Sequence, residues 1–130
     1  MIRGAVAVIG GLVAWMIVAT VLNFGVREAL PGYHAAEASF AFTLSMKIAR
    51  LALATGATLA AGYVAGRLAR GGATPVRVLG GLLLVVFLPV HFSLWDKFPI
   101  WYHLFFLGSL VPLTNLGANL SRGQKFEAQL

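Results

Sequence analysis

The three histidines and two of the carboxylates are the side chains of this sequence best suited to chemistry. They are His34, His91, His103, Glu37 and Asp96. Imidazole and carboxylate groups together are common ligands for zinc, copper or iron, and a pair of imidazoles can hold a haem. None of the histidines has the HxxxH spacing that places two imidazoles on one helical face, so ordinary hydrogen bonding explains the same residues. A metal or haem redox centre is an alternative hypothesis, and the sequence itself predicts no cofactor.

Lys47 and Arg50 are two cations inside an otherwise apolar, Ala-rich stretch. Charged residues in such a stretch usually mark a functional site, because an ion in hydrocarbon is costly. At about 100° per residue they continue a stripe of small and weakly polar side chains, which we expect to face other helices. Lys47 or Arg50 would then pair with Asp96 or Glu37 around an outward-facing pocket for an anionic head group or solute. The alternative is that both cations extend to the membrane surface.

The segment 89–104 combines aromatic residues with two prolines. Its tryptophans and its tyrosine, which join a large apolar ring to one N–H or O–H group, are Trp95, Trp101 and Tyr102. Such side chains concentrate at membrane–water interfaces, where one part of the ring is wet and the other is apolar. We interpret the segment either as an aromatic belt that holds a tight hairpin or as a docking site for a lipid, a quinone-like ring or a partner subunit.

The composition places most of the chain in lipid. Of the 130 residues 59% are hydrophobic and 11% are charged, and the mean hydropathy is +0.85. Soluble chains carry roughly a quarter charged residues, so this chain cannot cover a water-facing surface in the usual way. The absence of cysteine excludes disulfides, thiolate metal sites and thiol redox chemistry. The net charge of +6 comes from lysines and arginines scattered among apolar segments, a pattern that does not favour nucleic acid as a partner.

Four apolar segments are long enough to cross a bilayer, which takes about 20 residues. They cover approximately residues 4–26, 38–66, 76–94 and 100–120. The first exceeds the roughly 7–15 residues of a signal-peptide core and is not followed by a small-residue cleavage site, so we interpret it as an uncleaved span. The sequence therefore predicts an all-α integral membrane protein, a four-transmembrane-helix bundle that forms a single domain over residues 1–130.

Two details refine this bundle. The helical pattern of the second segment begins as early as Ala35 and is longer than a span needs, so part of it must tilt or stand outside the hydrocarbon. Gly62 and Gly66 form a GxxxG pattern, which favours close contact with another helix. Asn23 in the first span has a side chain that can hydrogen-bond across to the fourth.

Counting lysine and arginine near the ends of the spans predicts the orientation, because cytoplasmic loops carry an excess of them. One side holds Arg3, Arg67, Arg70, Arg77, Arg122 and Lys125, and the other side holds Arg27, Lys47, Arg50 and Lys97. We therefore expect both termini to be cytoplasmic, the protein to lie in the cell (inner) membrane, and all three histidines to lie at the outer face. His91 and His103 are then at facing ends of consecutive spans, where they can meet.

No residue set in the sequence matches a catalytic or transport motif. We expect a non-enzymatic interaction or accessory subunit that binds membrane lipids or a partner membrane subunit at its outer aromatic and polar rim, and that can form a homo-oligomer. A small solute or ion transporter using Lys47, Arg50 and Asp96 is the first alternative, and the metal or haem redox protein is the second. An enzyme that acts on a lipid head group, with Asp96 or Glu37 as general base, is a further one.

Overall fold

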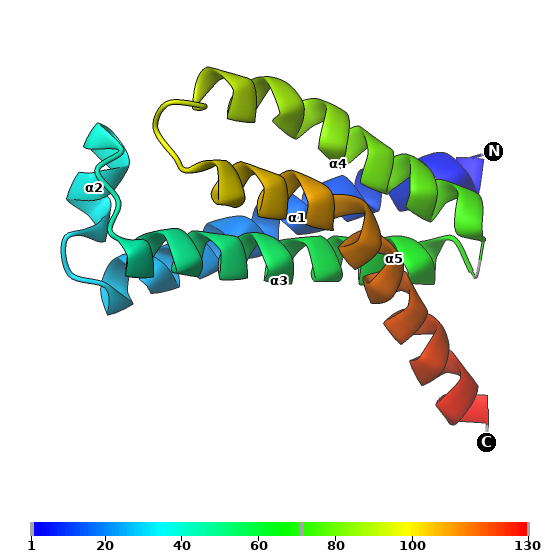
Figure 1. Ribbon diagram of the computed structural model, residues 1–130. Coiled ribbons are helices and arrows are strands. Elements are labelled where there is room, and N and C mark those ends of the chain that lie inside the picture. The colour runs from blue at the N-terminus through cyan, green and yellow to red at the C-terminus, as the bar shows by residue number, and fades with distance from the viewer. Residues whose placement is uncertain (1, 71, 130) are drawn as a thin grey trace.

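The computed structural model describes residues 2–70 and 72–129 of the chain, with side chains as far as Ser121. Over these residues helices are the only regular elements, and Figure 1 shows them in chain order. They are α1 (Ile2–Ala29), α2 (Tyr33–Ser39), α3 (Leu44–Leu68), α4 (Ala73–Ser93) and α5 (Ile100–Gln129). Within the described residues α1, α3, α4 and the Ile100–Ser121 part of α5 are long and apolar enough to cross a membrane. By its helices the chain is a small multi-span membrane protein, and the predictions of an all-α structure and of four candidate spans are confirmed.

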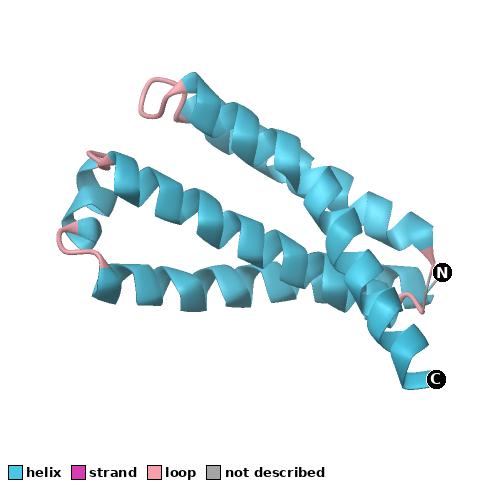
Figure 2. Ribbon diagram, turned by 60° about the horizontal axis from the view of Figure 1, so that its bottom comes forward, coloured by secondary structure: helices cyan, strands magenta, loops and turns pink. Residues whose placement is uncertain are grey.

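The long helices run back and forth, so the bundle has two distinct ends (Figure 1). The end of α1, helix α2, the start of α3 and the loop 94–99 lie together at what we call the α2 end. The start of α1 and the connection from α3 to α4 lie at the opposite end, which we call the N-terminal end. Figure 2 shows the loops at these ends of the long helices. The end that faces the cytoplasm stays a prediction, and the side chains of Arg122 and Lys125 lie outside the described residues.

The second span starts later than predicted, because the chain breaks between α2 and α3. Phe40 adopts a left-handed φ of 57° and ends α2. Thr43 then caps α3, and its side-chain oxygen accepts a hydrogen bond from the Met46 amide at 3.3 Å. A threonine in this position satisfies one of the amides that a helix start leaves unpaired. The predicted helix over 38–66 is thus replaced by α3, whose 25 residues are enough for one span, and by the separate short helix α2 at the end of the bundle.

Helix α3 is central and packs against α1, α4 and α5. Small residues let its backbone touch that of α5 in the half of the bundle nearer the N-terminal end. A Cβ on Gly62 would collide with the main-chain oxygen of Thr114, and a Cβ on Gly66 would lie 2.9 Å from the Cα of Ala118. Glycine removes the side chain that would keep two membrane helices apart. The helix contact predicted from the GxxxG pattern is confirmed.

Toward the α2 end, α4 and the first turns of α5 diverge from α1 and α3 in both views (Figure 1, Figure 2). Aromatic side chains occupy this wider half. Phe98 stacks on Tyr102 with the ring centroids 4.3 Å apart and on Phe42 with the centroids 5.6 Å apart. The stacked rings of Phe42 and Phe98 thus join the loop before α3 to the loop before α5. This half is therefore held by side chains, among which the polar groups of the candidate site lie.

Candidate functional site

Arg50 lies inside the bundle, and its hydrogen-bond partners are neutral. Its Nη1 donates to the Tyr33 hydroxyl at 3.0 Å, and its Nε donates to the Tyr102 hydroxyl at 3.2 Å. The guanidinium also lies over the rings of Phe42 and Phe98, 4.7 and 5.9 Å from their centroids. Ring faces attract a cation, most strongly where water is scarce. Among the described side chains no carboxylate oxygen lies within 4.0 Å of Arg50, so phenols and rings surround its charge without neutralising it.

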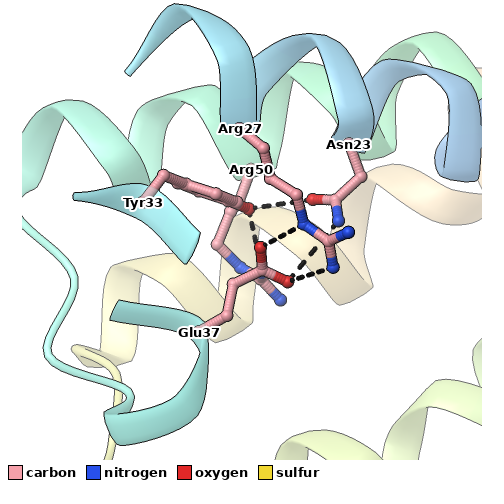
Figure 3. Close-up of polar contacts among 5 residues, drawn as sticks. All are labelled: Asn23, Arg27, Tyr33, Glu37 and Arg50. Atoms are coloured by element: carbon pink, nitrogen blue, oxygen red, sulfur yellow. Dashed lines mark hydrogen bonds and ion pairs between the residues drawn. The ribbon is translucent and has the colours of Figure 1, made fainter. Parts of the chain in front are cut away.

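Arg27 and Glu37 form an ion pair beside Arg50 (Figure 3). Nε and Nη2 of Arg27 lie 2.6 and 3.1 Å from the two carboxylate oxygens of Glu37, a two-pronged contact. Asn23 donates to the same carboxylate at 3.5 Å and accepts from the Tyr33 hydroxyl at 3.1 Å. The hydrogen bond from Arg27 holds the pKa of Glu37 below its ordinary value. Two guanidiniums therefore share the region with one carboxylate, which leaves one positive charge at Arg50.

The turn between α1 and α2 assembles this cluster. Asn23 and Arg27 are four residues apart on α1, so both side chains lie on the same face of the helix. The chain then reverses at Gly32, whose φ of 81° favours glycine, and α2 returns toward that face. Tyr33 is fully buried at the start of α2, and Glu37 follows it by about one helical turn. A short helix that carries only a few polar residues thus delivers the carboxylate to Arg27.

A cavity of about 330 Å³ opens beside these residues, and we call it the Arg50 cavity. All four long helices and α2 contribute to its wall. The residues that line it are Trp15, Ala19, Thr20, Asn23, Glu37, Arg50, Leu53, Ala54, Phe87, Tyr102 and Phe106. The polar members belong mostly to the α2 end, so the cavity has a charged wall on that side and an apolar wall deeper in the bundle.

Aromatic side chains form the floor of the Arg50 cavity. Trp15 donates its indole N–H to the Thr58 hydroxyl at 3.0 Å and packs on Phe87 with the ring centroids 4.8 Å apart. Phe87 in turn packs on Phe106, with the centroids 5.0 Å apart. The indole donor is therefore used within the protein, and the floor presents mainly apolar surface. A molecule in the cavity would meet charge at one end and rings at the other.

His91 and His103 meet near this cavity. Their Nδ1 atoms lie 2.7 Å apart, and both side chains are at most 5% exposed. Nε2 of His103 lies 3.3 Å from the main-chain oxygen of Trp95, which can only accept, so Nε2 carries a hydrogen. When both rings are neutral, Nδ1 of His103 therefore accepts and Nδ1 of His91 donates. The predicted approach of these two histidines is found, and one hydrogen atom joins them.

The predicted metal or haem centre would use His34, His91 and His103, and the described part of the chain brings only the last two of these together. The Nδ1 atoms of His91 and His103 face each other at hydrogen-bond distance. His34 is exposed on α2, whereas His91 belongs to α4 and His103 to α5. No group of three His, Cys, Asp or Glu residues comes together among the described residues. The geometry of His91 and His103 is that of a buried hydrogen-bonded pair.

The predicted ion pair between Lys47 or Arg50 and Asp96 or Glu37 is not formed among the described side chains. Glu37 is paired with Arg27 instead. Asp96 is exposed in the loop 94–99, and Lys47 is half-buried about one turn before Arg50 without lining the cavity. Of these four predicted residues, only Arg50 and Glu37 are brought together at one site.

The three predicted aromatic residues separate into two kinds. Trp95 and Trp101 are 46% and 45% exposed at the α2 end, where a membrane interface would reach them. Tyr102 is 3% exposed, lines the Arg50 cavity and accepts the hydrogen bond from Arg50. The prediction of an aromatic rim thus describes the two tryptophans, whereas Tyr102 belongs to the interior.

Sequence reasoning missed other residues that build the site, among them Trp15, Arg27, Tyr33 and Phe42. One signal was available, because Asn23 and Arg27 are polar residues spaced for a single helical face at the end of a span. Tyr33 directly follows a Pro-Gly turn, which the sequence shows, but its burial depends on where α2 packs.

No family model matches the chain, and no curated protein or solved structure matches it either. The chemistry of the Arg50 cavity is therefore the basis for a functional proposal.

Proposed function

We propose that this membrane protein is a binding or accessory protein, and that its Arg50 cavity holds the anionic group of an amphiphile, a carboxylate or a phosphate. The observation that carries the proposal is that Arg50 lines a cavity in the bundle without a carboxylate partner among the described side chains. A guanidinium inside a membrane bundle is costly unless its charge has a purpose or a partner. Its described partners are two phenols and two rings, and the side chain lines a cavity.

Arg50 has hydrogen-bond donors left for such a ligand. A guanidinium has five N–H groups, and the hydrogen bonds to Tyr33 and Tyr102 use two of them. The remaining donors lie in one plane, which matches the two oxygens of a carboxylate or phosphate. Arg27 does not compete for the same anion, because Glu37 occupies its guanidinium. The positive charge that remains in the cluster favours a ligand that carries a negative charge.

The floor of the cavity supports an amphiphile over a simple ion. Trp15, Phe87 and Phe106 would contact an apolar portion of the ligand while Arg50 holds its charged group. Below this floor the backbones of α3 and α5 touch at Gly62 and Thr114. This arrangement favours a binding site that opens toward the α2 end over a path through the bundle, and hence binding over transport.

The proposal is tested with Trp15 as an internal reporter. The double variant Trp95→Phe/Trp101→Phe leaves Trp15 as the single tryptophan of the chain. Titrating this variant in dodecyl maltoside micelles with dodecyl phosphate should change the Trp15 emission in a saturable way. Adding Arg50→Gln should weaken the apparent affinity about tenfold or more, since a hydrogen bond to a charged group is worth about 1.5–3 kcal/mol.

Lys47→Gln is the matched control, because it removes the same charge from the same helix about one turn away without touching the lining. Its affinity should equal that of the parent, and Arg50→Lys should bind with intermediate affinity because it keeps the charge but loses the planar pair of donors. An equal loss in the Arg50→Gln and Lys47→Gln variants, or emission that never saturates, would contradict a specific anion site. Dodecylphosphocholine, whose headgroup has no net charge, should bind more weakly than dodecyl phosphate.

A further inference from the structure

A second basic site lies at the N-terminal end of the bundle, away from the Arg50 cavity. The start of α1 and the end of α3 border an open hollow of about 580 Å³, which we call the Arg67 hollow. Its lining consists of three arginines and three aliphatic residues, namely Arg3, Arg67, Arg70, Ile2, Val6 and Leu68. The arginines come from two segments more than sixty positions apart in the sequence, so the packing of α1 against α3 creates the cluster.

The guanidiniums of this cluster have no counter-charge among the described side chains. The structure gives Arg3, Arg67 and Arg70 no ion pair and no side-chain hydrogen bond there. The carboxylates of the described side chains belong to Glu28, α2 and the loop 94–99, which all lie at the α2 end. Three like charges that border one hollow repel one another, and an anion between them would relieve that repulsion.

The backbone at the end of α3 strengthens the case for Arg70. Its φ is 50°, in the left-handed region that favours glycine over other residues. Its amide donates to the Arg67 carbonyl at 3.3 Å, so the two arginines are joined by one tight turn. The chain therefore carries an arginine at a strained position that glycine would occupy at lower cost, and this residue supplies the third guanidinium of the hollow.

The other half of the lining is apolar and open to the surroundings. Ile2 is 82% exposed, and Val6 and Leu68 are exposed as well. Gly10 makes room for the Leu68 side chain, because a Cβ at that position would collide with it. Aliphatic surface next to arginines at the end of membrane helices matches a molecule that has a phosphate above and a hydrocarbon chain below.

We infer that the Arg67 hollow binds an anionic phospholipid, with the lipid phosphate held by Arg3, Arg67 and Arg70 and an acyl chain against Ile2, Val6 and Leu68. An excess of arginine on one side of a membrane is a common orientation signal. Such a signal requires only that arginines lie on one side of the membrane. It does not require that arginines from two helices border the same hollow, or that aliphatic side chains line that hollow as well. Free phosphate offers the same charge but would leave the aliphatic wall uncovered, so the lipid is the better occupant.

The test measures lipid retained by the purified full chain. The Arg50→Gln variant serves as the parent, so that the Arg50 cavity contributes nothing and the two proposals can fail separately. After incubation with equal amounts of dioleoylphosphatidylglycerol and dioleoylphosphatidylcholine, native mass spectrometry gives the ratio of the two lipids on the protein. These lipids share acyl chains, so headgroup charge decides the ratio. We expect phosphatidylglycerol to be enriched about threefold or more, and Arg67→Gln to bring the ratio close to one.

Arg77→Gln is the matched control, since Arg77 is an exposed arginine at the same end but borders a different hollow, with Asn115 and Asn119. Its enrichment should equal that of the parent. Equal loss in Arg67→Gln and Arg77→Gln, or no enrichment in the parent, overturns the site. A second arm adds sodium phosphate at constant ionic strength. Retention of phosphatidylglycerol in this arm supports the lipid, and its complete displacement by inorganic phosphate overturns the lipid assignment.

Discussion

The two halves of the bundle hold their helices together by different means. Toward the N-terminal end, α3 and α5 touch through their backbones at Gly62, Gly66 and Gly117. Toward the α2 end, the same helices are joined through side chains, with Arg50 on α3 donating to the Tyr102 hydroxyl on α5. The first half is close-packed where glycines lie, and the second half contains a cavity of about 330 Å³.

This difference shows how a short chain can keep a cavity inside a stable bundle. The side chains that line a cavity lack van der Waals contacts on the side that faces it. The half that contains the cavity therefore contributes less packing energy to the stability of the fold. The glycine contacts fix the distance between α3 and α5 at the other half, and from there the helices diverge toward the α2 end (Figure 1). We therefore expect the close-packed half to carry most of the stability and the α2 end to carry the binding at the Arg50 cavity.

The largest effect should come from filling the glycine contact. A side chain on Gly117 would collide with the main chain of Leu59, which cannot move away without shifting α3. Gly117→Leu should therefore lower the free energy of unfolding by about 3 kcal/mol, at the upper end of what overpacking costs. Gly108→Leu is the control on the same helix, because nothing lies within 4 Å of a Cβ at that position, and it should cost less than about 0.5 kcal/mol.

Unfolding of both variants by sodium dodecyl sulfate in mixed micelles, followed by circular dichroism, provides this measurement. If Gly108→Leu destabilises the protein as much as Gly117→Leu, the stability does not depend on backbone contact, and the proposed division between the two halves fails.

A smaller effect is expected from the hydroxyl of Tyr33, which joins α1, α2 and α3. It accepts from Arg50 and donates to Asn23, and the residue is fully buried. Tyr33→Phe removes both hydrogen bonds and leaves two polar groups without this partner, at a cost of about 1–2 kcal/mol. Tyr102→Phe removes the one hydrogen bond that its hydroxyl makes among the described residues, so it should cost less.

The same unfolding assay compares the two phenylalanine variants. Dodecyl phosphate binding by Tyr33→Phe adds a second readout, because Arg50 loses the partner that orients one edge of its guanidinium. Equal costs for Tyr33→Phe and Tyr102→Phe would mean that the bridge from Tyr33 to Asn23 adds nothing to stability.

The spans could be predicted from the sequence because length and apolar composition determine them. The break before α3 could not, since it depends on the left-handed backbone of Phe40 and on the cap by Thr43. An Ala-rich helical pattern runs through both positions, and composition does not distinguish a continuous helix from one that is interrupted by four residues. A cap is a local hydrogen bond that can override such a pattern.

The candidate site was predicted in part. Arg50 could be identified because a charged residue in an apolar segment is unusual, whatever the arrangement of the helices. Its partners could not, since the sequence offered Asp96 and Glu37 as carboxylates, and the structure places Asp96 in an exposed loop and Glu37 against Arg27. Glu37 reaches the site because the turn at Gly32 directs α2 back toward α1. That direction is a property of the turn, which the sequence pattern does not specify.

The smallest effect, and the one that best isolates the α2 end, is the pH dependence that Glu37 confers. Its pKa is lowered in the folded protein, chiefly by the hydrogen bond from Arg27, while burial opposes that shift and Asn23 and Arg50 add to it. A carboxyl with a lowered pKa stabilises the fold above its ordinary pKa of about 4.5, and this contribution is lost as the pH falls through the lowered value. The wild type should therefore lose more thermal stability than Glu37→Gln between pH 6 and pH 3.5, by a modest amount because the pair is partly exposed.

The difference between these two proteins is the quantity to measure, since His91 and His103 are present in both and cancel. Arg27→Gln should behave much like Glu37→Gln, because it removes the hydrogen bond that is the main cause of the lowered pKa of Glu37. Parallel melting temperatures for wild type and Glu37→Gln across this range would show that the ion pair does not hold α2 against α1. The attachment of α2 to α1 and α3 would then have to rest on Tyr33, and the loss in Tyr33→Phe should be correspondingly larger than predicted above.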